Sequence, residues 1–272
     1  MNLPTLLPLI VLVVWGSLAL VGHWLPIAPD EIVLAKILAP PSWDEWLGYD
    51  DLGRSIADRL VIGAQTSFVV AVLVTAVSTA LGTLIGVTGA WLGGMWDHGV
   101  VRIIDIVLAF PGVLLAIALA GLLGPGIENV VIALIAVGWV GFARLARAQA
   151  LSVKHREHIQ AAQALGTGSY TIIFRHLLPL ITTPIIVEVS FGIAGVVIAE
   201  AGLSFLGLGV QPPAASWGTM IRDGTRYMLV APHMVIAPGL ALFLVVLSVN
   251  LLGDRIRDKL DVRSRVLVSP SL

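Results

Sequence analysis

Several long stretches of the 272-residue chain contain no aspartate, glutamate, lysine or arginine, among them residues 1–29, 60–96, 106–127 and 227–253. Each is long enough to cross a bilayer, because about 20 predominantly apolar residues span the hydrocarbon core as a helix. The composition agrees, since 57% of the residues are hydrophobic, 12% are charged and the mean hydropathy is +0.96. These features predict an all-α, polytopic membrane protein.

Hydropathy along the chain predicts six membrane-spanning helices. They are expected at Leu3–Val21, Leu60–Trp91, Val101–Leu123, Ile127–Phe142, Leu180–Ala199 and Pro232–Leu252. The first could instead be a secretory signal peptide, but no basic residue precedes its apolar core and no A-x-A-like cleavage site follows it. A retained first helix is therefore the preferred interpretation.

Basic residues near the helix ends predict the orientation, because lysine and arginine are retained on the cytoplasmic side. They gather in the loop at 143–179 and after the sixth helix: Arg144, Arg147, Lys154, Arg156, Arg175, Arg255, Arg257, Lys259, Arg263 and Arg265. The segment before the second helix is instead acidic, with Asp30, Glu31, Asp44, Glu45, Asp50, Asp51 and Asp58. Both termini are therefore expected in the cytoplasm.

The chain is expected to form one membrane domain with short flanking parts. Residues 1–59 would hold the first transmembrane helix and an extracytoplasmic acidic segment. Residues 60–263 would form the main transmembrane domain with its cytoplasmic loop at 143–179, and residues 264–272 a cytoplasmic tail. Four indoles near predicted membrane ends favour interfacial anchoring over stacking on a substrate, and they are Trp24, Trp43, Trp46 and Trp217.

Composition also excludes several kinds of function. Without cysteine the chain can form no disulfide framework, thiolate metal site or cysteine nucleophile. A net charge of −1 and a pI near 6.6 provide no basic surface suited to nucleic acid. No lysine follows a glycine, as a phosphate-binding loop requires, so ATP hydrolysis is not expected in this chain. His155 and His158 alone make a weak metal site, and no catalytic, cofactor or metal site is predicted.

The stretch EHIQAAQALGTGSYTIIFRHLLP, residues 157–179, has the pattern of a short helix, a glycine turn and a second helix. Residues 157–165 are good helix formers, Gly166 and Gly168 break the run, Ser169 is expected to cap the second helix and Pro179 to limit it. One face carries Ile159, Ala162 and Leu165, at spacings of three. From the residues alone, an amphipathic helix lying on the membrane surface remains an alternative.

This loop resembles the EAA signature of ABC-importer permeases, in which a glutamate and paired alanines precede a glycine and, further on, a leucine-proline. Gln160 replaces the usual glutamate directly before the alanines, and Glu157 supplies the acid that peptide-importer permeases often keep three residues earlier. Leu180 also departs from that subclass, which often has asparagine there. The resemblance assigns contact with the ATPase to Glu157, Gln160, Ala161, Ala162, Ala164, Gly166 and Pro179.

Three further stretches resemble the permeases of dipeptide, oligopeptide and nickel importers. They are WLGYDDLGRS at 46–55, RIIDIVLAFP at 102–111, and AEAGLSFLGLGVQPP at 199–213 with the later SWG and NLLGDRIRD. Tyr49 and Ser55 depart from the first block. The matching positions expected to have structural or gating roles are Asp51, Gly53, Arg54, Asp105, Pro111, Glu200, Gly207, Trp217, Gly253 and Asp254.

The resemblance implies a permease subunit in the bacterial inner membrane that forms half of a path for peptides or similar small solutes. Its expected partners are a second homologous permease, two ATP-binding subunits or domains and an extracytoplasmic binding protein, with ATP and magnesium bound by the ATPase. The 157–165 helix would dock in a cleft of that ATPase and rock the bundle between inward- and outward-facing states. A nickel or metal-chelate permease is the alternative within the family.

Several isolated polar residues remain open at this point. Glu188 falls within the fifth predicted helix and Glu200 at its end, where a charge should face the bundle interior, and structural roles are favoured over contact with a substrate. An intramembrane enzyme built on them would need a nucleophile or metal set that is not visible. Arg102 and Asp105 suit an ion pair on one helix face. Pro111 should disturb the third helix, as a hinge or as a tolerated kink.

Overall fold

The computed structural model describes residues 3–260, and the predicted tail at 264–272, with Arg263 and Arg265, lies outside them. The helices are α1 Leu3–Val21, η1 Gly22–Trp24, η2 Leu34–Lys36, α2 Ile56–Leu92, α3 Gly94–Leu108, α4 Gly112–Leu123, α5 Ile127–Val153, α6 Glu157–Ala164, α7 Ser169–Thr171, η3 Ile172–Leu177, α8 Leu178–Phe205, α9 Trp217–Thr225 and α10 His233–Leu260. Within residues 3–260 there is no strand, only an isolated bridge between Tyr49 and Ser55. The all-α prediction is confirmed.

Within residues 3–260, five helical segments are long and apolar enough to span a membrane by themselves, and a bent pair, α3 with α4, forms a sixth candidate. The prediction of one helix at Val101–Leu123 is therefore wrong, because α3 and α4 meet at 86°. The break falls at Ala109–Pro111, where Pro111 has an extended backbone and starts α4 as its N-cap. Proline lacks the N–H that would continue the ladder of α3, so Pro111 produces a corner here and not a mild kink.

The fourth predicted helix continues well past its expected end at Phe142, and α5 reaches Val153. Hydropathy falls at Arg144 and Arg147, but charged side chains do not interrupt backbone hydrogen bonding. The fifth predicted helix begins early, because α7, η3 and α8 form one run from Ser169 to Phe205. Pro179 was expected to limit the preceding helix, and this is wrong.

The reason lies in η3, which is a π-helical turn directly before Pro179. Its wider i→i+5 hydrogen bonding includes a bond from the Leu178 N–H to the Ile173 carbonyl. The wider turn accommodates a proline ring that would collide with a carbonyl in a regular helix. Ser169 does not cap this helix, because Gly168 is the N-cap residue and no side chain bonds there.

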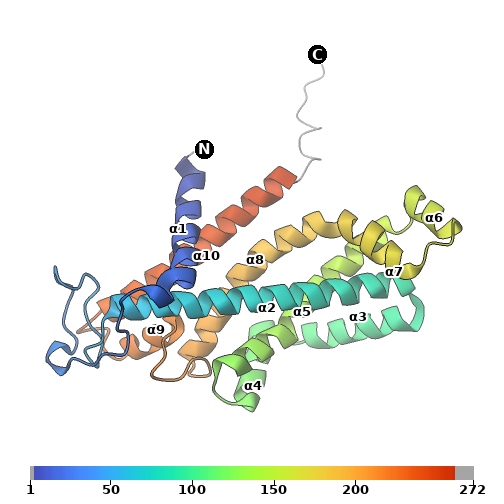
Figure 1. The fold of residues 1–272 in the computed structure, drawn as a ribbon. Coiled ribbons are helices and arrows are strands. Elements are labelled where there is room, and N and C mark those ends of the chain that lie inside the picture. Colours follow the sequence, from blue (N-terminus) through green and yellow to red (C-terminus); the bar gives the residue numbers. More distant parts are fainter. Residues whose placement is uncertain (1–2, 261–272) are drawn as a thin grey trace.

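Helices α2, α5 and α8 pack along one another through the middle of the molecule (Figure 1). Small residues allow the backbones to approach closely, since Gly82 and Gly86 of α2 lie directly against the main chain at Trp139 and Ala143 of α5. The acidic segment and α9 lie at one end of these helices, and α6 lies at the other (Figure 1). The fold therefore has two chemically different ends joined by long helices.

Candidate functional site

The end of α6 is defined by a glycine turn. The N–H of Thr167 donates to the Ala162 carbonyl at 3.0 Å, and the N–H of Gly166 donates to the Gln163 carbonyl at 2.9 Å. This pair of bonds is a Schellman motif, which needs a left-handed residue after the helix. Gly166 has φ +80°, a conformation that side chains with a Cβ rarely adopt. The predicted sharp turn at Gly166 is confirmed.

One buried side chain fastens α6 to the rest of the molecule. Ile159 is fully buried and packs in a cluster with Val153 of α5 and Ile172 and Leu177 of η3. The predicted apolar face is only partly correct, because Ala162 is half-buried whereas Leu165 is 87% exposed. Leu165 follows the last residue of α6, so the turn carries its side chain away from the face that Ile159 occupies.

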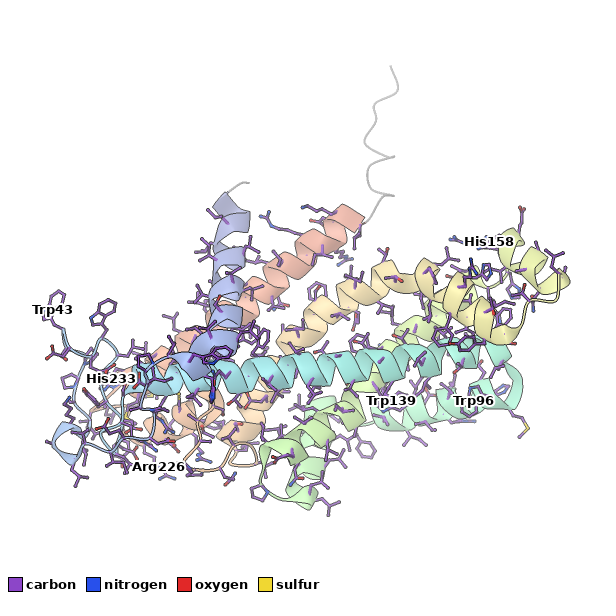
Figure 2. All side chains as sticks on the ribbon, in the orientation of Figure 1. Trp43, Trp96, Trp139, His158, Arg226 and His233 are labelled. Atoms are coloured by element: carbon purple, nitrogen blue, oxygen red, sulfur yellow. The ribbon has the colours of Figure 1, made fainter. Side chains whose placement is uncertain are left out.

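The opposite face of α6 is free among the described residues. Glu157, Gln160, Ala161 and Ala164 are exposed on it, and Leu165 extends the surface with an apolar tip. Nearby, the rings of Tyr170 and Phe174 stack with centroids 4.5 Å apart, and both side chains are exposed. Of the predicted contact residues, Pro179 is exposed on the adjoining helix. His158 marks this end in Figure 2.

The helices beneath this surface are tied by an ion pair that sequence reasoning missed. Arg147 of α5 donates from Nε and Nη2 to the two carboxylate oxygens of Asp97 in α3, at 2.6 and 2.7 Å. Lys154 adds a bond from its Nζ to the Ala90 carbonyl at 3.0 Å. Arg147 and Lys154 therefore hold α2, α3 and α5 together, and they are also among the basic residues that predict the orientation. A charge pair 50 residues apart leaves no local sequence signal.

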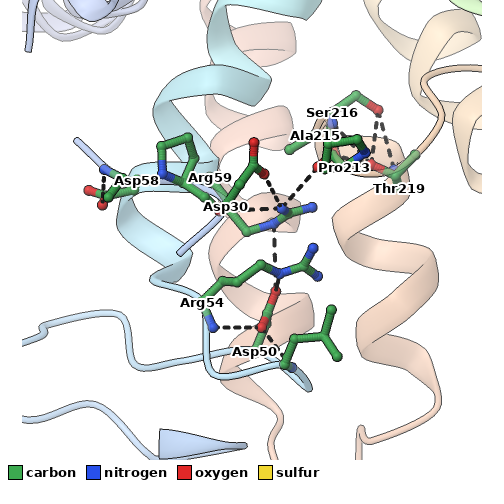
Figure 3. Close-up of polar contacts among 12 residues, drawn as sticks. Asp30, Asp50, Arg54, Asp58, Arg59, Pro213, Ala215, Ser216 and Thr219 are labelled. Atoms are coloured by element: carbon green, nitrogen blue, oxygen red, sulfur yellow. Dashed lines mark hydrogen bonds and ion pairs between the residues drawn. The ribbon is translucent and has the colours of Figure 1, made fainter. Parts of the chain in front are cut away.

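At the other end, the block at 46–55 folds into a tight turn around Asp50 (Figure 3). The carboxylate of Asp50 accepts hydrogen bonds from the backbone N–H groups of Leu52 and Arg54 at 2.9 Å and from Arg54 Nε at 2.6 Å. Gly53 has φ +75°, and a Cβ there would collide with the Val33 carbonyl. The sequence prediction had named Asp51 here, but the structure places Asp50 at the centre of the turn.

Asp51 lies beside this turn, with Arg54 Nη2 3.7 Å from its Oδ1. Burial raises the pKa of its carboxyl above the ordinary value of 3.8, the negative charge of Asp50 adds to the rise, and Arg54 opposes it. On the neighbouring surface the hydroxyl of Tyr49, which accepts from Lys36 Nζ at 2.7 Å, raises the pKa of that ammonium group. Within the acidic segment, Asp51 and Lys36 therefore each have a polar partner.

Arg59 links three separate parts of this end and was not singled out from the sequence. Its Nη1 donates to Asp30 Oδ1 and to the Pro29 carbonyl, each at 3.4 Å, and to the Pro213 carbonyl at 3.3 Å (Figure 3). Its Nε lies 3.6 Å from Asp50 Oδ2. The side chain is buried, so the start of α2 holds the acidic segment against the stretch before α9.

Glu200 is fully buried where α8 meets α2. Ser67 donates to its Oε2 at 3.2 Å, and Ser204 donates to its Oε1 at 2.7 Å. The structural role expected for Glu200 therefore has partners, namely two serine hydroxyls. Gly207 ends α8 with φ +86° in a second Schellman motif, in which its N–H donates to the Ser204 carbonyl and the Leu208 N–H to the Leu203 carbonyl, each at 3.0 Å.

The sequence predicts that Trp217 anchors the chain at a membrane interface, but the structure buries its side chain among the helices. Its side chain is only 2% exposed, its Nε1 donates to the Leu60 carbonyl at 3.1 Å, and its ring centroid lies 6.4 Å from that of Trp15. Gly63 makes room for it, because a Cβ there would be 2.6 Å from the indole Cδ1. Trp24, Trp43 and Trp46 are exposed, and Trp43 extends away from the helices in Figure 2.

The remaining predicted residues fall in different surroundings. Arg102 and Asp105 are both exposed and form no ion pair with each other among the described residues, so the predicted pairing is wrong. Gly253 is buried where α10 crosses α8, and a Cβ there would lie 3.1 Å from that of Ser190. Asp254 is exposed. Most of the predicted residues therefore lie in two groups, one around α6 and one around Asp50, Glu200 and Trp217, and those outside both groups are Asp105, Pro111, Gly253 and Asp254.

The long apolar helices define an integral membrane protein, and α6 is exposed at one end of it. The chain belongs to the family described as binding-protein-dependent transport system inner membrane component, which it matches over residues 78–266. It is therefore a permease subunit of a bacterial ABC importer and is located in the inner membrane.

Relatives in enteric bacteria support this assignment. The glutathione transport system permease protein GsiD of Escherichia coli O6:K15:H31 is 44% identical over 221 residues, which cover 81% of this chain and 73% of the relative. The protein of the same name from Shigella boydii serotype 4 gives the same values. Among solved structures, the MetNI methionine ABC transporter in inward-facing conformations aligns with a TM-score of 0.55 at 20% identity, covering 74% of this chain and 95% of that one.

Proposed function

We propose that this chain forms half of the translocation path for peptides or similar small solutes and is driven by ATP hydrolysis on a partner chain. The cargo class rests on the 44% identity to permeases named for the transport of glutathione, which is itself a tripeptide. ATP and magnesium would be bound by the partner. A second homologous permease and an extracytoplasmic binding protein would complete the transporter.

The observation that carries this proposal is the construction of α6. Its buried residue Ile159 and the Schellman turn at Gly166 fix it firmly, while Glu157, Gln160 and Ala161 remain exposed. A helix fixed on one face and free on the other, with small alanines for close approach, suits insertion into a cleft of another protein. In this arrangement the α6 end faces the cytoplasm, as its basic residues predict, and the Asp50 end faces outward.

A pull-down from membranes tests the partners directly. The tagged chain should recover an ATP-binding subunit and a second permease, and Glu157→Gln together with Ala161→Trp in α6 should reduce recovery of the ATPase alone. Recovery of no ATP-binding protein by the wild-type chain would contradict the proposal. Uptake of labelled tripeptide compared with labelled nickel then separates a peptide permease from a metal or metal-chelate permease of the same family.

A further inference from the structure

A cavity of about 290 Å³ lies within the bundle, between α2, α4, α5 and α8. This is close to the lower end of small-molecule pockets, roughly 300 to 1,000 Å³. Glycines form much of its wall, among them Gly141 of α5 and Gly192 and Gly195 of α8. The corner at Pro111 contributes as well, because it places Gly112, the first residue of α4, against the same space.

Two buried hydroxyls line this cavity without a hydrogen-bond partner. Thr75 and Ser78 of α2 are 3% and 2% exposed, and neither Oγ atom bonds to any group of the described residues. Thr79 and Thr83 of the same helix also lack a partner but do not line this cavity, whereas Thr66 bonds to the Ile62 carbonyl. An unsatisfied hydroxyl in a membrane interior is costly, so Thr75 and Ser78 hold unused hydrogen-bonding capacity at the cavity wall.

Glu188 is the ionisable residue that lines the cavity. It is half-buried in the middle of α8 and has no ion-pair partner among the described residues. Gly192 and Gly195 follow it at spacings of four and seven, so all three lie on one face of the helix. A carboxylate is expensive in a membrane and marks a pathway or binding function by default. Glu188 belongs to neither group of sequence-predicted residues, and none of the contacts described above gives it a role.

We propose that this cavity is a binding stage on the translocation path, where Glu188 contacts a cationic group of the cargo such as the N-terminal ammonium of a peptide. Thr75 and Ser78 supply hydrogen bonds, and the glycines leave room for varied side chains. A cation is the matching partner because attraction to a carboxylate is strong where water is limited. This inference rests on the proposed function, since it deepens the assignment of cargo.

Thiol labelling tests the electrostatics of the cavity without any cargo. The chain has no cysteine, so Gly195→Cys introduces a single thiol, and no atom lies within 4 Å of the position of its Cβ. A cationic methanethiosulfonate reagent should label this cysteine at least about fivefold faster than an anionic reagent of similar size, given the nearby carboxylate. Glu188→Gln should remove the preference. Gly121→Cys on α4, also in open space, should show no dependence on Glu188.

Uptake tests the role of Glu188 toward cargo. Glu188→Gln conserves size and removes charge, and uptake of a tripeptide with a free amino terminus should fall about tenfold, the equivalent of one lost contact of about 1.4 kcal/mol. Glu188→Asp keeps the charge and should retain more uptake. Glu128→Gln makes the same chemical change at an exposed position of α5 and should leave uptake unchanged. Gly195→Val, compared with Gly121→Val, tests the cavity by filling it while Glu188 is kept.

The outcomes separate this inference from the proposed function. Equal labelling of Gly195→Cys by both reagents, or full tripeptide uptake by Glu188→Gln and by Gly195→Val, overturns the role of the cavity while the permease assignment stands. If the wild-type transporter takes up no peptide, the proposed cargo class fails, and a charge preference in labelling would still locate a cation-attracting cavity. If Glu188→Gln fails to insert into the membrane, Glu188→Asp and Gly195→Cys still test the role of the cavity.

Discussion

Arg147 donates hydrogen bonds to both carboxylate oxygens of Asp97, 50 residues away in the sequence, at 2.6 and 2.7 Å. The two side chains are 28% and 18% exposed, so the pair lies partly out of solvent. Two parallel bonds from a planar guanidinium fix direction as well as distance. The start of α3 is thereby held against α5 directly beneath the α6 end of the molecule.

Arg147→Lys keeps the charge but cannot form the paired bonds, and we expect a loss of stability of about 1 kcal/mol. Thermal unfolding of the purified protein in detergent measures this effect. The matched control is Arg102→Lys, because Arg102 is exposed on α3 and its replacement should change the midpoint little. An unaltered midpoint in Arg147→Lys would show that the pair contributes nothing to the fold.

Ile159→Ala should loosen α6, since removing a fully buried isoleucine side chain costs about 2 to 5 kcal/mol of packing. The loss falls on one short helix, so we expect faster proteolysis within residues 157–179 and reduced uptake while the protein still inserts. Leu165→Ala removes a side chain that is 87% exposed and should leave proteolysis unchanged. Similar behaviour of the two variants would contradict the anchoring role of Ile159.

Gly166→Val should abolish uptake while the protein remains inserted in the membrane. The substitution forces a β-branched residue to φ +80°, so the strain acts on the backbone turn and not on neighbouring side chains, of which none lies within 4 Å of the added Cβ. Gly168→Val is the control, because Gly168 has φ −67° and equally open surroundings. Uptake assays with membrane quantification compare them, and normal transport by Gly166→Val would remove the assigned role of this turn.

The raised pKa of Asp51 predicts a pH-dependent stability effect. Burial and the neighbouring Asp50 make the folded state take up a proton at Asp51 more readily than the unfolded state, whose value is near 3.8. The ionised carboxyl therefore disfavours folding above the raised pKa, and this penalty fades as pH falls through it toward 3.8. Asp51→Asn should stabilise the protein at pH 7 and lose that advantage in acid.

Denaturant titration in detergent, at pH 7 and again in acid, measures the difference in unfolding free energy between Asp51→Asn and the wild type. Asp44→Asn serves as the control, because Asp44 is exposed in the same segment. A stabilisation by Asp51→Asn that does not diminish in acid would mean that ionisation of Asp51 is not its cause.

The sequence allowed the helices to be predicted wherever one physical signal dominated. Long apolar runs located α1, α2 and the start of α10 within a few residues, because the bilayer selects for uncharged length, but α10 continues eight residues past its predicted end at Leu252. The prediction failed where a helix continues beyond its apolar run, as at Arg144 and Arg147, which end the apolar run but not α5. The prediction also failed at the prolines, since Pro111 breaks a helix and Pro179 does not. Hydropathy gives no sign of the π-helical turn that accommodates Pro179.

The candidate site divides in the same way. Gly166 and Gly207 could be predicted because their backbone conformations restrict the residue type. Trp217 was misjudged as an interfacial anchor because its role depends on tertiary neighbours, namely Gly63 and Trp15, and Asp50 was not singled out although it forms the centre of the turn beside Asp51. Arg59, Asp97 and Ile159 gain their roles only when distant helices meet. Motif positions thus indicated where to look, and packing decided what each residue does there.

The run from Ser169 to Phe205 contains 37 residues without a break. At about 1.5 Å per residue it is roughly 55 Å long, against about 30 Å of hydrocarbon. Movement imposed near Tyr170 therefore reaches the neighbourhood of Glu200 along one helical run with no loop to absorb it, although Pro179 and Pro184 each remove one N–H donor from its hydrogen bonding. The helix should serve as an internal ruler, whose end-to-end distance stays nearly constant during transport while the angle at Pro111 remains free to vary.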